Sequence, residues 1–199
     1  SALQALSMLL DDQYREFEGF MKIFEQLFTN YNCNVSVILE KAVKLNALQY
    51  CKIILSHHGE YVNHLFSFGT ALHYAIQNKF METVRYLISI PEIDINISNC
   101  KSHTPLTLAT EMGEVEIVSM ILAHPTFDHS KSNINFAFFI TNDKEILDML
   151  YRNPNLDINY QYDKSILTQS FKSSTSIITS LMHALMHKNH HKLELIISH

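Results

Sequence analysis

The chain has 199 residues, 47% hydrophobic and 18% charged, a composition typical of a folded globular protein that excludes intrinsic disorder. Its 20 acidic and 15 basic residues give a formal net charge of −5, and no segment concentrates Lys and Arg, so no nucleic-acid partner is expected. The apolar runs are far shorter than the roughly 18 residues that span a bilayer, and no basic segment precedes the first apolar residues, so neither a membrane partner nor an export signal is indicated.

The three cysteines indicate a reducing compartment. Cys33, Cys51 and Cys100 are odd in number and widely spaced, and they form no C-x-x-C pair, so a disulfide framework is not indicated. We therefore expect a cytoplasmic protein, located in the host-cell cytoplasm if the chain is a pathogen effector. Because the chain begins at Ser1 rather than Met and stops within an apolar pattern, we also expect it to be part of a longer protein.

Helices are expected throughout, because only four Gly and four Pro interrupt the chain and apolar residues recur at helical spacing nearly everywhere. At the N-terminus, a short helix around Leu3 and Leu6 is expected to precede a long amphipathic helix capped by Asp11 or Asp12. The apolar stripe of that long helix runs through Leu10, Tyr14, Phe17, Met21, Phe24 and Phe28. The stripe favours a packing face, with a partner-binding helix as the alternative.

An internal repeat organises the rest of the chain. Small alanines recur at nearly equal intervals (75 − 42 = 33 and 109 − 75 = 34), at Ala42, Ala75 and Ala109. Leucines three positions earlier keep the same intervals, and so do pairs of loop residues: Asn63 with Asn96, Pro91 with Pro125, and Asp94 with Asp128. Self-similarity at such a period predicts a solenoid of stacked units.

Two of the units carry a recognisable motif. Residues 70–75 read TALHYA, residues 104–109 read TPLTLA, and residues 111–122 read EMGEVEIVSMIL. These segments resemble the ankyrin-repeat family, whose consensus contains T-P-L-H-x-A and then G-x-x-E-I-V-x-x-L-L. The physical logic agrees, because Thr104 can cap a helix and Pro105 suits its first turn. The small Ala109 then lets paired helices approach, and Gly113 closes the turn between them.

The resemblance implies an all-α ankyrin-repeat solenoid of stacked helix-turn-helix units. We expect an N-terminal helical cap at 1–33 and about five units at 34–66, 67–99, 100–132, 133–162 and 176–199, the last one truncated. The fourth unit is short, because Asp157 follows Asp128 at a smaller interval than the repeat period (157 − 128 = 29). A Ser/Thr-rich insertion at 163–176 is expected to be a surface insertion, with a functional loop or a short helix through Ile166, Leu167 and Phe171 as the alternative. The Pro-x-x-Asp-x-Asn loop endings are similar to ankyrin arrays of protists and of some intracellular bacteria.

No catalytic motif is present. The sequence lacks a Gly-rich phosphate loop, a G-x-S-x-G elbow and an H-E-x-x-H pair, so we expect no enzyme, no cofactor and no small-molecule substrate. In the last stretch, SLMHALMHKNHHKLELIISH, His183 and His187 have the i, i+4 spacing of zinc ligands, with His190 and His191 just beyond. The repeat register instead places Lys188 at the turn between two helices. We therefore interpret the stretch as a degenerate repeat and predict no metal site.

The resemblance also implies where a partner would bind, namely at the tips of the loops between units, called fingers below, and on the exposed inner face of the first helices. The candidate contact residues are Leu65, Phe66, Ser67, Phe68, Ser98, Cys100, Lys101, His103, His129, Ser130, Lys131, Thr110 and Met112. The LFSF segment at 65–68 is apolar where polar residues are usual, which favours a partner site. The alternative is that these rings fold back onto the adjacent repeat.

The function that the sequence favours is a protein–protein interaction module that presents a concave ankyrin surface to another protein. The alternative is the targeting segment of a longer multidomain protein, such as a pathogen effector with an enzymatic domain elsewhere. A third interpretation, a His-based metalloprotein, predicts stoichiometric zinc in the purified protein.

Overall fold

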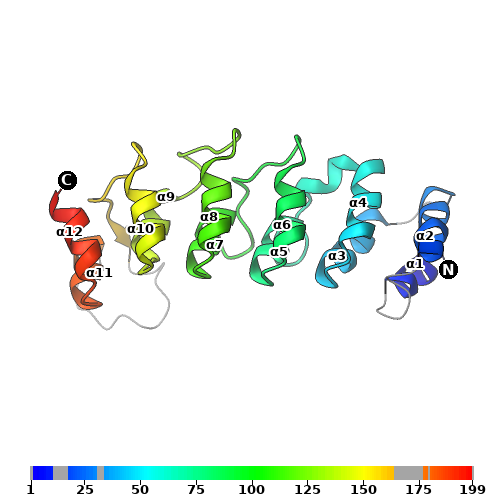
Figure 1. Ribbon diagram of the computed structural model, residues 1–199, viewed down its shortest axis with the longest axis horizontal. Coiled ribbons are helices and arrows are strands. Elements are labelled where there is room, and N and C mark those ends of the chain that lie inside the picture. Colours follow the sequence, from blue (N-terminus) through cyan, green and yellow to red (C-terminus); the bar gives the residue numbers. More distant parts are fainter. Residues whose placement is uncertain (1, 11–17, 31–33, 164–176, 179, 199) are drawn as a thin grey trace.

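Helix pairs stacked in a row make up the computed structural model of the chain (Figure 1). The structure describes residues 2–10, 18–30, 34–163, 177–178 and 180–198. In this part of the chain the pairs follow one another from the N-terminal to the C-terminal end, and the loops after α4, α6 and α8 connect successive pairs. The predicted all-α class is therefore confirmed.

The described elements are six helix pairs, a short 3-10 helix and one minimal strand pair. The helices are α1 (Ala2–Leu9), α2 (Glu18–Asn30), α3 (Val35–Lys44), α4 (Leu48–His57), η1 (Gly59–Asn63), α5 (Ala71–Gln77), α6 (Met81–Ile88), α7 (Pro105–Glu111), α8 (Val115–Leu122), α9 (Ile134–Ile140), α10 (Lys144–Tyr151), α11 (Ser180–Met186) and α12 (His190–Ser198). The strands β1 (Tyr162–Asp163) and β2 (Ile177–Ile178) pair antiparallel. No sequence pattern indicated this pair, which joins Asp163 to Ile177.

The N-terminal segment begins with the expected short helix, α1, but Leu10 of the expected long-helix stripe is not helical. Leu10 lies in the turn after α1, whereas Met21, Phe24 and Phe28 belong to α2. Phe24 and Phe28 are buried, and the Phe24 ring meets the Tyr50 ring edge-on at 4.7 Å, so this part of the stripe is a packing face. The proposed caps Asp11 and Asp12, and the stripe positions Tyr14 and Phe17, lie outside the described residues, as do Ile166, Leu167 and Phe171 of the insertion.

The ends of the first helices follow the motif residues. Thr104 is the N-cap of α7, its side chain accepts a hydrogen bond from the Thr107 N–H at 3.3 Å, and Pro105 occupies the first turn. At the other end, Gly113 has a φ of +69°. Glycine adopts this left-handed conformation at little energetic cost because it has no Cβ. The predicted cap and turn are therefore confirmed.

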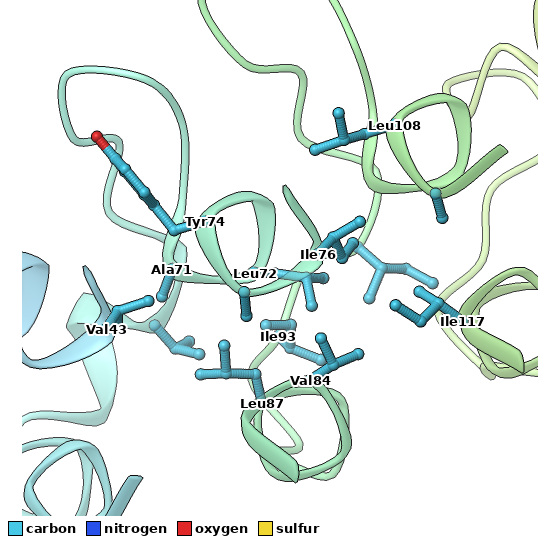
Figure 2. Close-up of a cluster of buried hydrophobic side chains, with 14 of the residues drawn as sticks. Val43, Ala71, Leu72, Tyr74, Ile76, Val84, Leu87, Ile93, Leu108 and Ile117 are labelled. Atoms are coloured by element: carbon cyan, nitrogen blue, oxygen red, sulfur yellow. The ribbon is translucent and has the colours of Figure 1, made fainter. Parts of the chain in front are cut away.

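A continuous apolar core joins the units. Ala42, Ala75 and Ala109 are all 0% exposed, as a close approach between helices requires. Figure 2 shows how side chains of three consecutive units meet around α5 and α6, with Val43 from the preceding unit and Ile117 from the following one. Because no unit covers both of its own faces, stacking supplies the burial, which contributes about 2 kcal/mol for each fully buried Leu or Ile.

Asparagine side chains tie the connecting loops of adjacent units together. The Asn63 side-chain oxygen accepts the Asp94 N–H at 2.8 Å, and one unit later the Asn96 oxygen accepts the Asp128 N–H at 2.9 Å. The amide of Asn96 also donates to the Thr126 carbonyl oxygen at 2.8 Å. The equal spacing of these residues in the sequence thus reflects a bond that recurs between units.

Candidate functional site

The described surface contains a groove of about 700 Å³ between three fingers and the start of α9. We call it the finger groove. It is lined by Lys101, Ser102, His103, Ser130, Asn133, Ile134, Asn135, Phe136, Tyr160 and Gln161. Three stretches far apart in the sequence therefore converge on one hollow, as expected for a site that receives another molecule.

The finger groove lies where one finger is shorter than its neighbour. From Asp94 to the helix N-cap Thr104 the chain takes 10 steps (104 − 94), whereas from Asp128 to the N-cap Asn133 it takes 5 (133 − 128). Ser130 and Asn133 of the short finger line the groove, together with residues of the fingers on both sides. The five missing residues thus account for the hollow between the second finger (98–103) and the segment at 160–161.

The second finger is held by one buried side chain. The Asn99 side-chain oxygen accepts the N–H groups of Lys101 at 2.9 Å and His103 at 3.0 Å, and the Asn99 N–H donates to the His103 carbonyl oxygen at 2.8 Å. A Cβ at Gly69 would come within 2.8 Å of the Asn99 Cβ, so only glycine lets the preceding finger pass this close. The groove wall that carries Lys101 and His103 is therefore rigidly built.

His73 connects that wall to the preceding unit. Its Nε2–H donates to the His103 carbonyl oxygen at 3.0 Å, while its Nδ1 accepts the Thr70 N–H at 3.2 Å. This pattern requires the neutral tautomer with the proton on Nε2. Burial lowers the pKa of His73 to about 4, so the ring stays neutral near pH 7.

His103 presents its ring to the groove from this wall. Its Nδ1 lies 3.4 Å from the Glu111 carboxylate, and its ring centroid lies 6.4 Å from that of Phe136. Glu111 does not itself line the groove. Lys101 is exposed, and its ammonium lies 5.8 Å from the centre of the Phe68 ring.

Of the residues predicted to contact a partner, Lys101, His103 and Ser130 line the finger groove. The remaining finger residues Ser98, Cys100, His129 and Lys131 are exposed beside it without lining it, and the ammonium of Lys131 is 3.4 Å from the Asp128 carboxylate.

The aromatic rings of the first finger (64–69) pack against Tyr74 of α5. The ring centroids of Phe66 and Phe68 lie 6.2 and 5.6 Å from that of Tyr74, and both Phe side chains are half-buried. The Ser67 hydroxyl donates to the Glu40 carboxylate at 2.9 Å. Leu65 is 54% exposed, which leaves it as the open apolar residue of this finger.

Of the two residues predicted on the inner helix face, Thr110 needs correction. Thr110 is 3% exposed, because α7 lies between α5 and α9 and both neighbours pack against it. Thr110 therefore cannot touch a partner, and the expectation that it is surface-exposed is wrong. Met112 is the C-cap residue of α7, beside Gly113 at the turn, where it is half-buried against the core.

Most of the residues that line the groove were not predicted from the sequence. These residues are Ser102, Asn133, Ile134, Asn135, Phe136, Tyr160 and Gln161. The signal that could have found them is the short interval between Asp128 and Asp157 (157 − 128 = 29), since a shortened unit has to leave a gap between longer neighbours.

The C-terminal histidines flank a turn, as the repeat register predicted. Lys188 has a φ of +53°, α11 ends at Met186 and α12 begins at His190. The His183 and His187 ring centroids are 4.4 Å apart, but Nδ1 of His183 already lies 3.5 Å from the Lys192 side-chain nitrogen. Within the described residues, no three His, Cys, Asp or Glu side chains are grouped so as to hold a metal ion.

These features define an α-helical repeat solenoid with a hollow surface between its fingers. Residues 39–136 match the family model for ankyrin repeats, in three copies. This part of the chain therefore belongs to the ankyrin-repeat family, whose repeats are protein–protein interaction modules. No protein with a curated description matches the sequence.

The fold is shared with a solved structure over nearly its whole length. The crystal structure of an ankyrin repeat domain from Acinetobacter baumannii AYE is similar with a TM-score of 0.68 and 17% sequence identity, covering 98% of this chain and 96% of that one. The likeness shows that the ankyrin fold extends beyond the matched residues 39–136 to the outer helix pairs. Among the described helices, none combines the length and the apolar character that crossing a bilayer requires.

Proposed function

We propose that the chain binds another protein and that the finger groove is the contact site. The observation that carries this proposal is the hollow created by the short third finger (128–133), which brings polar and aromatic side chains of three fingers together. A groove of about 700 Å³ has the size of sites that enclose a short peptide segment or a few side chains of a partner. The proposal assigns binding, and no catalysis, to this chain.

We also propose the boundaries of the repeat units that the sequence predicts. The helical cap at 1–33 and the units at 34–66, 67–99, 100–132, 133–162 and 176–199 fit a stack in which each pair packs on the next. Leu65, Ser98, Cys100, His129 and Lys131 are proposed as the outer ring of contacts around the groove, because all are exposed on adjacent fingers.

We further propose a cytoplasmic location. Cys51 is a buried free thiol and Cys100 an exposed one, which suits a reducing compartment. Burial raises the pKa of the Cys51 thiol to about 12, so this thiol is inert, whereas the exposed Cys100 would be open to oxidation elsewhere.

The experiment fills the groove with a large side chain. Ser130→Trp places an indole in the hollow, and the matched control Ser119→Trp places one on the exposed side of α8. We expect the unmodified chain and Ser119→Trp to capture the same proteins from cell extract. Ser130→Trp should fail to capture them. Capture that is the same for all three proteins, each with the same circular dichroism spectrum, would contradict the proposal.

A further inference from the structure

We propose that the finger groove selects an acidic, extended segment of its partner that carries an aromatic or aliphatic side chain. This inference rests on the proposed function and specifies the chemistry of its ligand. It is carried by the charge and polarity of the residues that line the groove.

The lining contains no carboxylate, although the chain has 20 acidic residues against 15 basic ones. Lys101 supplies the positive charge of the wall. Among the described residues Lys101 has no ion-pair partner, since its ammonium is placed over the Phe68 ring. His103, in contrast, already lies 3.4 Å from the Glu111 carboxylate, so Lys101 is the residue that a carboxylate of the ligand would reach.

The floor of the groove adds an apolar surface. Ile134 is buried, Phe136 is half-buried and Tyr160 is 46% exposed, so an aromatic or aliphatic side chain entering the groove would be covered by apolar groups. An aromatic ring of the ligand could stack against the rings of Phe136 and Tyr160. These contacts supply affinity that a single cation cannot give in water.

The polar residues of the rim suit an extended backbone. Asn133 and Gln161 are exposed amides that line the groove, and each can both donate to and accept from a peptide group. Asn135 is less free, because its side-chain oxygen already accepts the Asp157 N–H at 2.8 Å. A polyphosphate is a poorer fit, since it would meet one lysine beside aromatic and amide groups.

The test is a selection of random 12-residue peptides displayed on phage against the 199-residue chain, followed by affinity measurements with the enriched peptides. We expect Asp and Glu next to Phe, Tyr, Leu or Ile. Lys101→Glu should weaken binding of these peptides by tenfold or more. Lys144→Glu, which makes the same charge change at an exposed residue of α10 outside the groove, should leave their affinity within twofold.

The two proposals fail in different ways. Peptides that lose binding with Ser130→Trp but are basic or uncharged, or that keep their affinity with Lys101→Glu, would overturn the acidic ligand and leave the groove as the binding site. If no enriched peptide is sensitive to Ser130→Trp, both the ligand chemistry and the proposed function are wrong.

Discussion

The ammonium of Lys192 donates hydrogen bonds to the carbonyl oxygens of Phe139 at 2.6 Å and Thr141 at 3.1 Å, at the end of α9. The turns that close the first helix of the other units contain a residue with positive φ, at Asn46, Lys79, Gly113 and Lys188. In the unit of α9 the chain is extended at Thr141 instead, with φ −75° and ψ 145°. The buried Lys192 of the next pair therefore supplies donors to the carbonyls at this helix end.

The first prediction concerns Lys192, whose pKa burial lowers to about 7. Between pH 7 and its ordinary value of 10.5, the folded protein holds this amine largely neutral while the unfolded chain binds a proton. The stability it contributes is therefore complete above pH 10.5 and is lost as the pH falls to 7. We expect the free energy of unfolding of the unmodified chain to rise relative to Lys192→Met by up to about 1.4 kcal/mol per pH unit from pH 7 to 9. Urea unfolding of both proteins measures this difference, and a constant difference would contradict the prediction.

The stacked fold could be predicted from the sequence because every unit packs its helices in the same way and therefore needs similar residues at equivalent positions. Ala75 and Ala109 recur because only a small residue fits between paired helices, and Thr104 and Gly113 mark helix ends by their own conformational preferences. These packing and helix-end requirements involve only one unit and its neighbours. The regular spacing of the residues in the sequence is therefore enough to reveal them.

The finger groove could be predicted only in part. Lys101 and His103 were found because the register places them on a finger, but Phe136 and Tyr160 were missed because their position depends on a five-residue shortening between them and the preceding unit. The register likewise placed Thr110 on an open face, whereas the first helices on either side cover it. A periodic sequence pattern reveals only the features that all units have in common. The groove, in contrast, is formed by the shorter third finger, in which one unit differs from the others.

The second prediction follows from the buried hydroxyl of Thr110, for which the described residues offer no hydrogen-bond partner. Thr110→Val keeps the shape and removes the unpaired group, so we expect a gain of about 1 kcal/mol in unfolding free energy. The control is Thr107→Val in the same helix, where the hydroxyl donates to the Thr104 carbonyl oxygen at 3.0 Å. That change should cost about 1 kcal/mol. Chemical denaturation gives both values, and equal effects of the two variants would refute the assignment.

The third prediction concerns His73, whose pKa is lowered to about 4 from its ordinary 6.5. The folded protein resists protonation here, so this stability is complete above pH 6.5 and is lost as the pH falls toward 4. Gln at this position can still accept the Thr70 N–H but does not titrate. The unfolding free energy of the unmodified chain should therefore fall faster than that of His73→Gln between pH 6.5 and 4. His129→Gln, at an exposed site, should follow the unmodified chain, and parallel curves for all three proteins would contradict the prediction.

The fourth prediction separates packing from partner contact in the first finger (64–69). Phe68 is half-buried, and its ring centroid lies 5.6 Å from that of Tyr74, so Phe68→Ser removes packed apolar surface and should cost about 1–3 kcal/mol of unfolding free energy. Leu65 is 54% exposed, so Leu65→Ser should change the stability by less than about 0.5 kcal/mol. If Leu65 belongs to the outer ring of contacts, Leu65→Ser should still weaken partner capture severalfold at unchanged circular dichroism. Thermal melts and capture assays on both variants decide between the two roles: a stable Phe68→Ser protein that no longer captures partners would show that this ring is a contact rather than a packing element.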